Sequence, residues 1–375
     1  MATYAAVCLW NFKPLFADEH VDNLENLATL TTFTGSIDES WFYLVSVAIE
    51  ARGAPILPLM LTAIQAARVS DSPTVTACLR AFAERLDDLG TLLQRMHESC
   101  DPQVFYHRIR PFLAGSKNMA EAGLPNGVIY EDSTGSEQYR QYSGGSNAQS
   151  SIIQFFDVVL GIEHRPTGEK KDMSSESELE GRVPPPKHNF LFEMRKYMPG
   201  PHRRFLEDVS LVANIRDYVE SHTNDKELTL AYDACLAMLR AFRDKHINIV
   251  TRYIIVKSRE SRSLSRSKSP ETTRRKVDIA TSSRQGNNEA QGTKKNLKGT
   301  GGTALIPFLK QARDETGEPA IDSWARRVMN RDFSTRGQGD FFLGKTVEQA
   351  DDGLNVCGMA GTWAIDDNAG GLCHY

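Results

Sequence analysis

The 375-residue sequence lacks the features of a secreted, membrane-spanning or disulfide-stabilised protein. No apolar run approaches the roughly 20 residues that a helix needs to cross a bilayer. The N-terminal stretch has no basic region and is interrupted by Asn11 and Lys13, so it does not read as a secretory signal. The six cysteines, at positions 8, 78, 100, 235, 357 and 373, form no Cys-x-x-Cys pair. We therefore expect a cytoplasmic protein with free thiols, without a disulfide framework or a zinc cluster.

The sequence also lacks convincing runs of alternating apolar and polar residues, which excludes a large β-sheet, and it shows no internal repeat. What it has instead are segments with helical periodicity, separated by glycine and proline. The segments predicted as helices are 41–52, 59–68, 71–100, 101–113, 148–162 and 228–257. The fold class expected from this pattern is all-α.

Positive charge is concentrated in one segment. Residues 257–298 contain 12 Lys and Arg against 4 Asp and Glu, a local charge of +8. Because the net charge of the whole chain is −4, the rest of the chain carries about −12. This Ser/Arg-rich segment and the segment 164–188 have few apolar side chains to bury, and we expect both to be disordered. Ser269-Pro270 predicts a phosphorylation site. No aromatic residue occurs between 257 and 298, so we expect no nucleic-acid partner.

One histidine interrupts the apolar face of the predicted helix 228–257, which begins behind Asp225 as its N-cap. Residues on this face recur at intervals of three and four: Leu228, Tyr232, Cys235, Leu239, Phe242, His246, Ile249 and Tyr253. A desolvated imidazole must be hydrogen-bonded or coordinated, because an unpaired buried polar group costs about 1–3 kcal/mol. Two interpretations stay open for His246: a core histidine bonded to a carboxylate or carbonyl, or a metal ligand.

Two glycine-rich segments could bind anions through their backbone. Residues 299–304 match the pattern G-x-G-x-x-A, but no strand precedes them, which excludes a dinucleotide-binding fingerprint. They remain a hinge or a mobile loop that closes over a ligand. In residues 142–148, Ser146 is either the N-cap of the following helix or part of an anion site built from backbone N–H groups.

Two charged residues stand among apolar neighbours. Arg110 lies in the stretch Phe105–Phe112, either as a surface arginine or as a guanidinium fork that holds a carboxylate in an apolar pocket. Asp157 interrupts the apolar face of the predicted helix 148–162 and therefore needs a partner.

Taken together, these segments resemble the indoleamine 2,3-dioxygenase family, the haem enzymes of tryptophan catabolism. The matching blocks are 40–51, 105–117, 126–131, 143–162, 195–206, 228–255 and 297–310. The resemblance implies a large helical haem-binding domain at 41–320, a remnant of the small N-terminal domain or a linker at 1–40, and an irregular tail at 321–375. Because the chain begins at what resembles the last helix of that small domain, we expect an N-terminally truncated member that lacks most of it.

The resemblance also implies roles for individual residues. His246 matches the proximal ligand of the haem iron, and Asp157 and Arg243 match residues that support the haem. Arg110 matches the arginine that binds the substrate carboxylate. The remaining matches to the substrate site are Phe42, Tyr43 and Phe105 in the aromatic wall, Ser46 on the distal side, Gly145 and Ser146 beside substrate and haem, Thr300, Gly301, Gly302 and Thr303 in a mobile loop, and Tyr4 and Val7 in the ceiling.

The implied activity is that of an oxidoreductase with haem b as cofactor and O₂ as co-substrate. Both oxygen atoms enter the indole ring of L-tryptophan and open its pyrrole ring to N-formylkynurenine, the first step of the kynurenine pathway. No acid–base residue is implied, since Ser46 is a poor base. We expect a monomer with a small indole as its partner and no membrane partner. The alternatives are a haem-binding homologue with little or no catalysis, acting in regulation or signalling, and a helical scaffold without haem.

Overall fold

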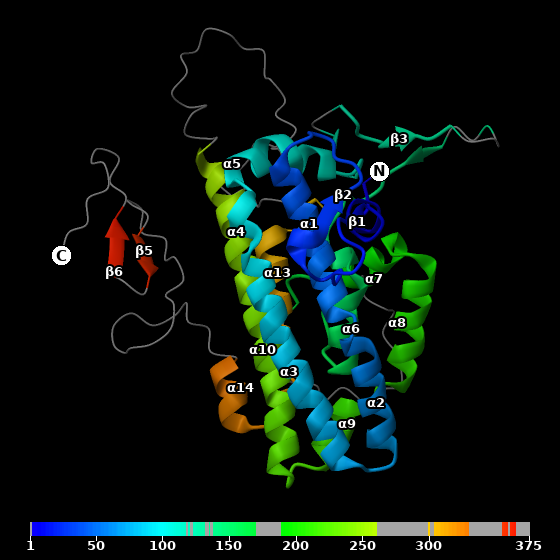
Figure 1. Ribbon diagram of the computed structural model, residues 1–375, viewed down its shortest axis with the longest axis vertical. Coiled ribbons are helices and arrows are strands. Elements are labelled where there is room, and N and C mark those ends of the chain that lie inside the picture. The colour runs from blue at the N-terminus through cyan, green and yellow to red at the C-terminus, as the bar shows by residue number, and fades with distance from the viewer. Residues whose placement is uncertain are drawn as a thin grey trace. The chain divides into compact units, whose positions relative to one another are not determined.

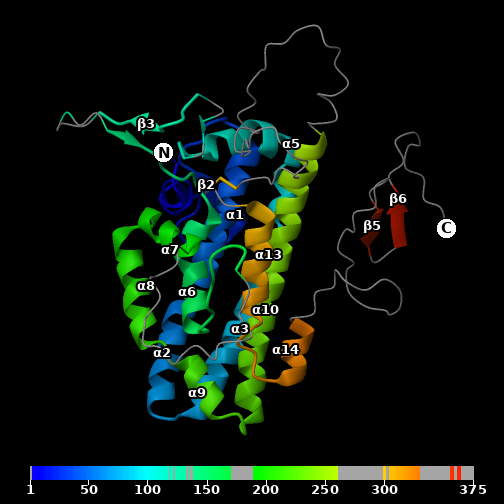
Figure 2. The same cartoon turned by 180° about the vertical axis from the view of Figure 1, so that it is seen from behind.

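The computed structural model describes residues 2–117, 119–120, 123–131, 135, 138–169, 189–260, 299–300, 304–329, 355–358 and 361–364. The chain divides into two compact units, Met1–Arg326 and Arg327–Tyr375. The first unit is mostly helical (Figures 1 and 2), which confirms the fold class expected from the sequence.

The helices occupy the segments where helical periodicity was found. The α-helices are α1 (Ile37–Gly53), α2 (Ile56–Arg68), α3 (Ser72–Gln94), α4 (Met96–Ser99), α5 (Pro102–Val104), α6 (Ser151–Val159), α7 (Phe190–Met194), α8 (Gly200–Val212), α9 (Ile215–Ser221), α10 (Lys226–Val250), α13 (Leu305–Thr316) and α14 (Ser323–Met329). Short π- or 3₁₀-helical segments are η1 (Ala5–Leu9), η2 (Leu24–Asn26), η3 (Phe105–Ile109), η4 (Arg110–Leu113), η6 (Asn147–Gln149), η7 (Arg195–Tyr197) and η8 (Thr251–Val256).

The two longest helices, α3 and α10, lie side by side and form the centre of the first unit (Figures 1 and 2). Each begins at an aspartate whose carboxylate accepts a hydrogen bond from the first turn: Asp71 from the N–H of Thr74, and Asp225 from that of Leu228. The apolar face of α10 packs on α3, where the buried Cys235 thiol donates to the Leu79 carbonyl. Cys235 is therefore a buried free thiol, as the sequence predicts.

Helices α1 and α2 pack against α3 in the same core. Together they form a segment, Ile37–Arg68, that is long and apolar enough to cross a membrane by length and composition. The core helices of a soluble protein pass the same test. Here the segment breaks between Gly53 and Ile56, and Ala48 and Met60 are completely buried within the protein.

The structure also contains short antiparallel strand pairs, which the sequence analysis did not predict. Strand β1 (Phe12–Pro14) pairs with β2 (Leu27–Thr29), and β3 (Val128–Ile129) pairs with β4 (Tyr139–Arg140). With two or three residues each, these strands are too short to show an alternating pattern. Residues 5–29 belong to the stretch 1–40 that was expected to be a remnant or a linker, and they form η1, β1, η2 and β2. Of these, η1, η2 and β2 contact α1.

Three further expectations need correction. The predicted disordered segment 164–188 begins too early, because His164 and Arg165 form buried or half-buried ion pairs; residues 170–188 lie outside the described part. Of the segment 257–298, residues 257–260 are helical, and the rest lies outside it. The tail expected to be irregular contains α14 and, within the second unit, the hairpin of β5 (Asn355–Gly358) and β6 (Gly361–Ala364).

Candidate functional site: an apolar cavity with one histidine

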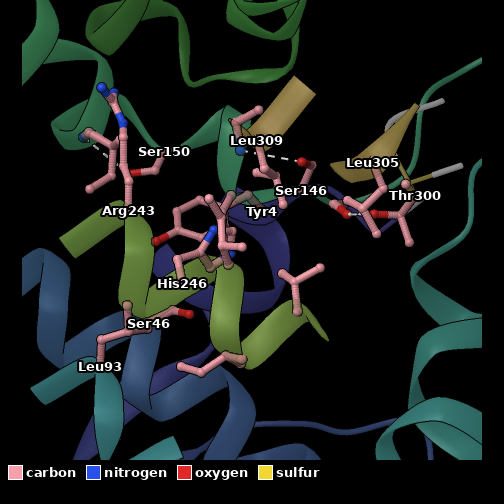
Figure 3. A pocket seen from close by; sticks show the side chains of 18 of the residues that line it. Tyr4, Ser46, Leu93, Ser146, Ser150, Arg243, His246, Thr300, Leu305 and Leu309 are labelled. Atoms are coloured by element: carbon pink, nitrogen blue, oxygen red, sulfur yellow. Dashed lines mark hydrogen bonds between the residues drawn. The ribbon is translucent and has the colours of Figure 1, made fainter. Parts of the chain in front are cut away.

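A cavity of about 250 Å³ lies inside the first unit (Figure 3). Its wall combines η1, α1, the segment 105–113, the loop 143–150, α6, α10 and α13. Of the residues expected at the site, twelve line this cavity: Tyr4, Val7, Phe42, Ser46, Phe105, Arg110, Gly145, Ser146, Asp157, Arg243, His246 and Thr300. The structure thus brings together residues that are up to 296 positions apart in the chain. Gly301, Gly302 and Thr303 lie outside the described residues.

His246 is the imidazole of this cavity wall and comes from the last two turns of α10. Burial and, to a lesser extent, the nearby Arg243 charge together lower its pKa to about 4. The ring is therefore neutral near pH 7, as a metal-binding imidazole must be. Its Nε2 atom lies 3.4 Å from the amide nitrogen of Asn147, which belongs to η6 across the cavity. Among the described residues, the ring is bonded to the Asn147 amide and to no carboxylate, which weakens the interpretation as a core histidine satisfied by a carboxylate.

One aromatic part of the wall comes from three helical segments, α1, η3 and η8. The rings of Phe42 and Phe105 lie 4.8 Å apart with an interplanar angle of 48°, and Tyr253 packs edge-on against Phe105 at 5.7 Å. Tyr43 differs from the expectation, because it is not among the residues that line the cavity. Successive residues of a helix point about 100° apart, so Tyr43 turns into the core, where its hydroxyl donates to the Glu39 carboxylate at 2.9 Å.

Arg110 is buried at the start of η4, with only 3% of its surface exposed. Because Arg110 is buried, it is not a surface arginine whose guanidinium group lies in water. Its guanidinium carbon lies 5.6 Å from the centre of the Tyr106 ring, within the range of a cation–π contact. The π-helical turn η3 precedes Arg110 and places both Phe105 and Arg110 on the cavity wall. A planar fork of N–H donors in an apolar cavity suits a carboxylate ligand.

The two glycine-rich segments meet at the cavity. The Thr300 hydroxyl donates to the Gly145 carbonyl at 2.7 Å, and the Gly144 N–H donates to the Thr300 carbonyl at 3.1 Å. A Cβ on Gly144 would lie 2.0 Å from the Leu113 carbonyl oxygen, so this close packing of backbones requires glycine. The Ser146 side chain accepts a hydrogen bond from Ala148 N–H and caps η6, which agrees with the N-cap interpretation.

Arg243 and Asp157 form a bidentate ion pair beside the cavity. Nη2 of Arg243 donates to both carboxylate oxygens of Asp157, at 2.6 and 2.8 Å. Burial alone raises the pKa of Asp157, but the charges of Arg243 and His164 outweigh it, so that pKa lies below its ordinary value. This pair supplies the partner that the position of Asp157 in an apolar face requires.

Sequence reasoning missed a polar cluster at one end of the cavity. The carboxylate oxygen Oε1 of Glu50 accepts hydrogen bonds from the Tyr4 hydroxyl at 2.9 Å and from the Ser150 hydroxyl at 2.6 Å. Burial raises the pKa of Glu50. Glu50 lies at the end of an otherwise apolar stretch of α1 and is separated by 46 and 100 positions from its partners, so no local pattern could have predicted the cluster.

The donor set restricts the kind of metal cofactor that fits. Among the described residues, no group of three or more His, Cys, Asp and Glu could hold a metal ion. A single neutral imidazole in an apolar cavity instead fits a metal whose other ligands belong to a macrocycle, as in haem. The exposed Asn147 side chain lies within hydrogen-bond distance of Nε2 of His246. The fold and the cavity therefore define a helical protein with one neutral imidazole, a candidate ligand for a metal cofactor, in the wall of an apolar cavity.

Comparison with known proteins supports this class. The family model described as "IDO: Indoleamine 2,3-dioxygenase" matches residues 1–319. An indoleamine 2,3-dioxygenase of Saccharomyces cerevisiae is 42% identical over 329 residues, which cover 84% of this chain and 67% of that protein. Indoleamine 2,3-dioxygenase nanC of Aspergillus nanangensis is 41% identical over 84% of this chain and 68% of its own length. The 6-hydroxytryptophan 2,3-dioxygenase fscD of Fusarium equiseti is 35% identical over 84% and 69%.

The chain belongs to the indoleamine 2,3-dioxygenase family. It spans about two thirds of the length of the relatives it matches. The resemblance expected from the seven sequence blocks is thus confirmed.

Proposed function

We propose that this protein binds haem through His246 and opens the pyrrole ring of L-tryptophan to give N-formylkynurenine. The observation that carries the proposal is the neutral imidazole of His246 in the wall of an apolar cavity that also contains the buried guanidinium of Arg110. One group can hold a metal cofactor and the other a substrate carboxylate. Membership of a dioxygenase family supports this combination.

His246 would supply the axial nitrogen of the haem. Because its pKa is lowered to about 4, the lone pair of Nε2 is available without loss of a proton at neutral pH. Asp157 and Arg243 would support the same side of the site, since Arg243 lies one helical turn before His246. In Figure 3 the guanidinium of Arg243 points away from His246, which leaves the imidazole facing the cavity.

Arg110 would bind the substrate carboxylate through its planar fork, and Phe42 and Phe105 would pack against the indole. One charged contact in an apolar cavity selects an amphipathic aromatic amino acid and fixes its orientation. Val7 and the Cys8 thiol, both buried in η1, close the cavity from another side and exclude water.

Haem supplies the activation of O₂, which is the difficult part of the chemistry. Both atoms of O₂ enter the C2=C3 bond of the indole, so no proton has to leave and no water is consumed. The protein accordingly needs no general base: the Ser46 hydroxyl is a poor base and already lies 3.5 Å from the Phe42 carbonyl. The chain positions the substrate and keeps solvent out.

The segment that contains Thr300 would close the cavity over the substrate. Its hydroxyl is bonded to Gly145, whose neighbour Ser146 also lines the cavity. We assign the same role to Gly301, Gly302 and Thr303 from the family resemblance alone. L-tryptophan is the substrate we propose, while the relative from Fusarium equiseti, named for 6-hydroxytryptophan, shows that members of the family differ in the indole they use.

The test is reconstitution of the full chain with haem, followed by turnover of L-tryptophan under reducing conditions in ¹⁸O₂. The proposal predicts N-formylkynurenine with both oxygen atoms labelled. Labelling of one atom only would contradict dioxygenation. Haem binding without product would favour a non-catalytic haem protein, and failure to bind haem would leave a helical scaffold.

A further inference from the structure

A second histidine, His164, lies next to the cavity wall with a carboxylate on each side of its ring. Nδ1 is hydrogen-bonded to Oε2 of Glu315 at 2.6 Å, and Nε2 lies 3.1 Å from Oδ2 of Asp157. The side chains of these three residues are 8%, 2% and 8% exposed, so the cluster is shielded from water. Nδ1 is hydrogen-bonded to Glu315 and Nε2 is in ion-pair contact with Asp157, so the carboxylate beside each nitrogen favours a proton on both, as in an imidazolium.

The charged groups around His164 are three carboxylates and two guanidinium groups, so their total charge is zero only if the ring carries its proton. Asp157 of α6 is bonded to Arg243 of α10, and Glu315 of α13 accepts hydrogen bonds from Arg165 N–H and Gln311. The Arg165 guanidinium is bonded to Glu318, on the same side of α13. Burial alone lowers the pKa of His164, but Asp157 and Glu315 outweigh that effect, and with Arg243 opposing them the pKa stays above its ordinary value.

The cluster connects three elements that form the cavity. Arg243 also donates to the Ala312 carbonyl at 3.2 Å and to the Thr316 hydroxyl, both on α13. Helix α13 in turn supplies Leu305, Phe308, Leu309 and Ala312 to the cavity wall. Removal of the His164 charge would leave Asp157 with Arg243, and Glu315 with the half-buried Arg165, whose Nε lies 3.6 Å from Oε1 of Glu315 and whose guanidinium is shared with Glu318. The buried cluster would then hold one negative charge in excess, which is costly.

We propose that His164, as an imidazolium between Asp157 and Glu315, is a positioning residue that fastens α13 to α6 and α10 and so holds the α13 wall of the cavity in place. Loss of its proton at higher pH weakens that attachment, and the cavity then holds its ligand less tightly. The proposal concerns the protein before any ligand binds and does not depend on the reaction catalysed.

Hydrogen exchange of the ligand-free full chain tests the attachment directly. His164→Gln removes the charge, and we expect exchange of the α13 amides (305–316) to accelerate at least about tenfold at pH 7. His202→Gln is the matched control, because His202 is exposed and bonded only to Ser151 among the described residues. The double variant His164→Gln/Glu315→Gln removes one charge of each sign, so it should recover most of the lost protection. Equal exchange of α13 in H164Q and H202Q would overturn the proposal.

Two readouts distinguish a positioning role from general destabilisation. In the unmodified chain with ¹⁵N-labelled histidine, both nitrogens of His164 should be protonated at pH 7; a single protonated nitrogen would overturn the proposal even if H164Q fails to fold. In haemin titrations, H164Q should weaken binding about tenfold at pH 6 and less at pH 9, where the unmodified chain has itself lost the charge. A loss that is the same at both pH values would contradict a role for the proton. Failure of the unmodified chain to bind haemin would refute the proposed function, while the exchange experiment would still decide the role of His164.

Discussion

Arg243 and His246 lie one turn apart on α10, yet the structure gives them opposite environments. Arg243 is bonded at 2.6 and 2.8 Å to the Asp157 carboxylate, whereas His246 faces the cavity as a neutral ring. A helix places residues i and i+3 on the same side, so one element delivers a charge-balanced ion pair and a neutral imidazole to adjacent places. This arrangement underlies the proposed cofactor site.

Replacement of Arg110 should separate substrate binding from cofactor binding. We expect Arg110→Leu to weaken binding of L-tryptophan by roughly 10²-fold, because a charge-assisted bidentate contact contributes about 2–3 kcal/mol. Tryptamine, which lacks the carboxylate, should bind the variant and the unmodified protein about equally. The measurement is the change in the haem spectrum on titration with each ligand.

The control for that experiment is Arg108→Leu, since Arg108 belongs to the same π-helical turn and is exposed. Equal losses for tryptophan and tryptamine in Arg110→Leu would show that Arg110 does not bind the carboxylate.

Glu39 should be essential for the stability of the N-terminal part. Its completely buried carboxylate accepts four hydrogen bonds: from Phe33 N–H at 2.8 Å, Thr34 N–H at 2.7 Å, the Thr34 hydroxyl at 2.6 Å and the Tyr43 hydroxyl at 2.9 Å. We expect Glu39→Ala to lower the free energy of unfolding by about 2–4 kcal/mol, because buried donors lose their acceptor. Denaturant unfolding measures this loss. The exposed Glu84→Ala in α3 should change the stability by less than about 0.5 kcal/mol, and a similar effect of both variants would refute the role of Glu39.

Gly144→Ala should displace the loop that closes the cavity. The added Cβ would lie 2.0 Å from the Leu113 carbonyl oxygen and 2.6 Å from Gly115 N, so the backbone of one segment has to move. We expect a destabilisation of about 1–3 kcal/mol, typical of overpacking, and weaker haemin binding. The comparison is Gly200→Ala, whose nearest atom is the flexible end of Arg204 at 3.4 Å. Unchanged haemin affinity in Gly144→Ala would contradict the role assigned to this close approach.

His246 and His164 should affect stability at opposite ends of the pH range. The pKa of His246 is lowered to about 4, so between that value and an ordinary value of about 6.5 the unfolded chain binds a proton that the folded chain does not. Stability therefore falls as the pH drops through this range. The pKa of His164 is raised, so its contribution is complete below about 6.5 and is lost as the pH rises through the higher folded value.

Thermal unfolding of the cofactor-free chain across pH 4–9 measures both effects. His246→Ala should flatten the acidic side of the curve of Tm against pH, and H164Q the alkaline side. The pKa values of Asp157 and Glu315 are lowered, so their contributions are lost only as the pH falls below about 4. An alkaline side that H164Q leaves unchanged would contradict the imidazolium assignment.

The sequence predicts those parts of the site that lie on periodic elements. The stripe on α10 identifies His246 as exceptional, and the apolar neighbours of Arg110 suggest a buried guanidinium. Partners that meet only through the tertiary fold leave no such pattern. Glu50 and Ser150 are 100 positions apart, and His164 lies in a charged stretch that resembles a linker, 151 positions from Glu315. Tyr43, by contrast, was expected in the cavity wall but does not line it, because a family match alone does not say which way a side chain points.

The most direct test of the account is a haemin titration of the full chain followed by its Soret band. The unmodified protein and the exposed-site control His202→Ala should bind haemin in a 1:1 ratio, whereas His246→Ala should lose the band and regain it when free imidazole is added. Binding of haemin by His246→Ala with the spectrum and affinity of the unmodified protein would contradict the assignment of His246 as the axial ligand.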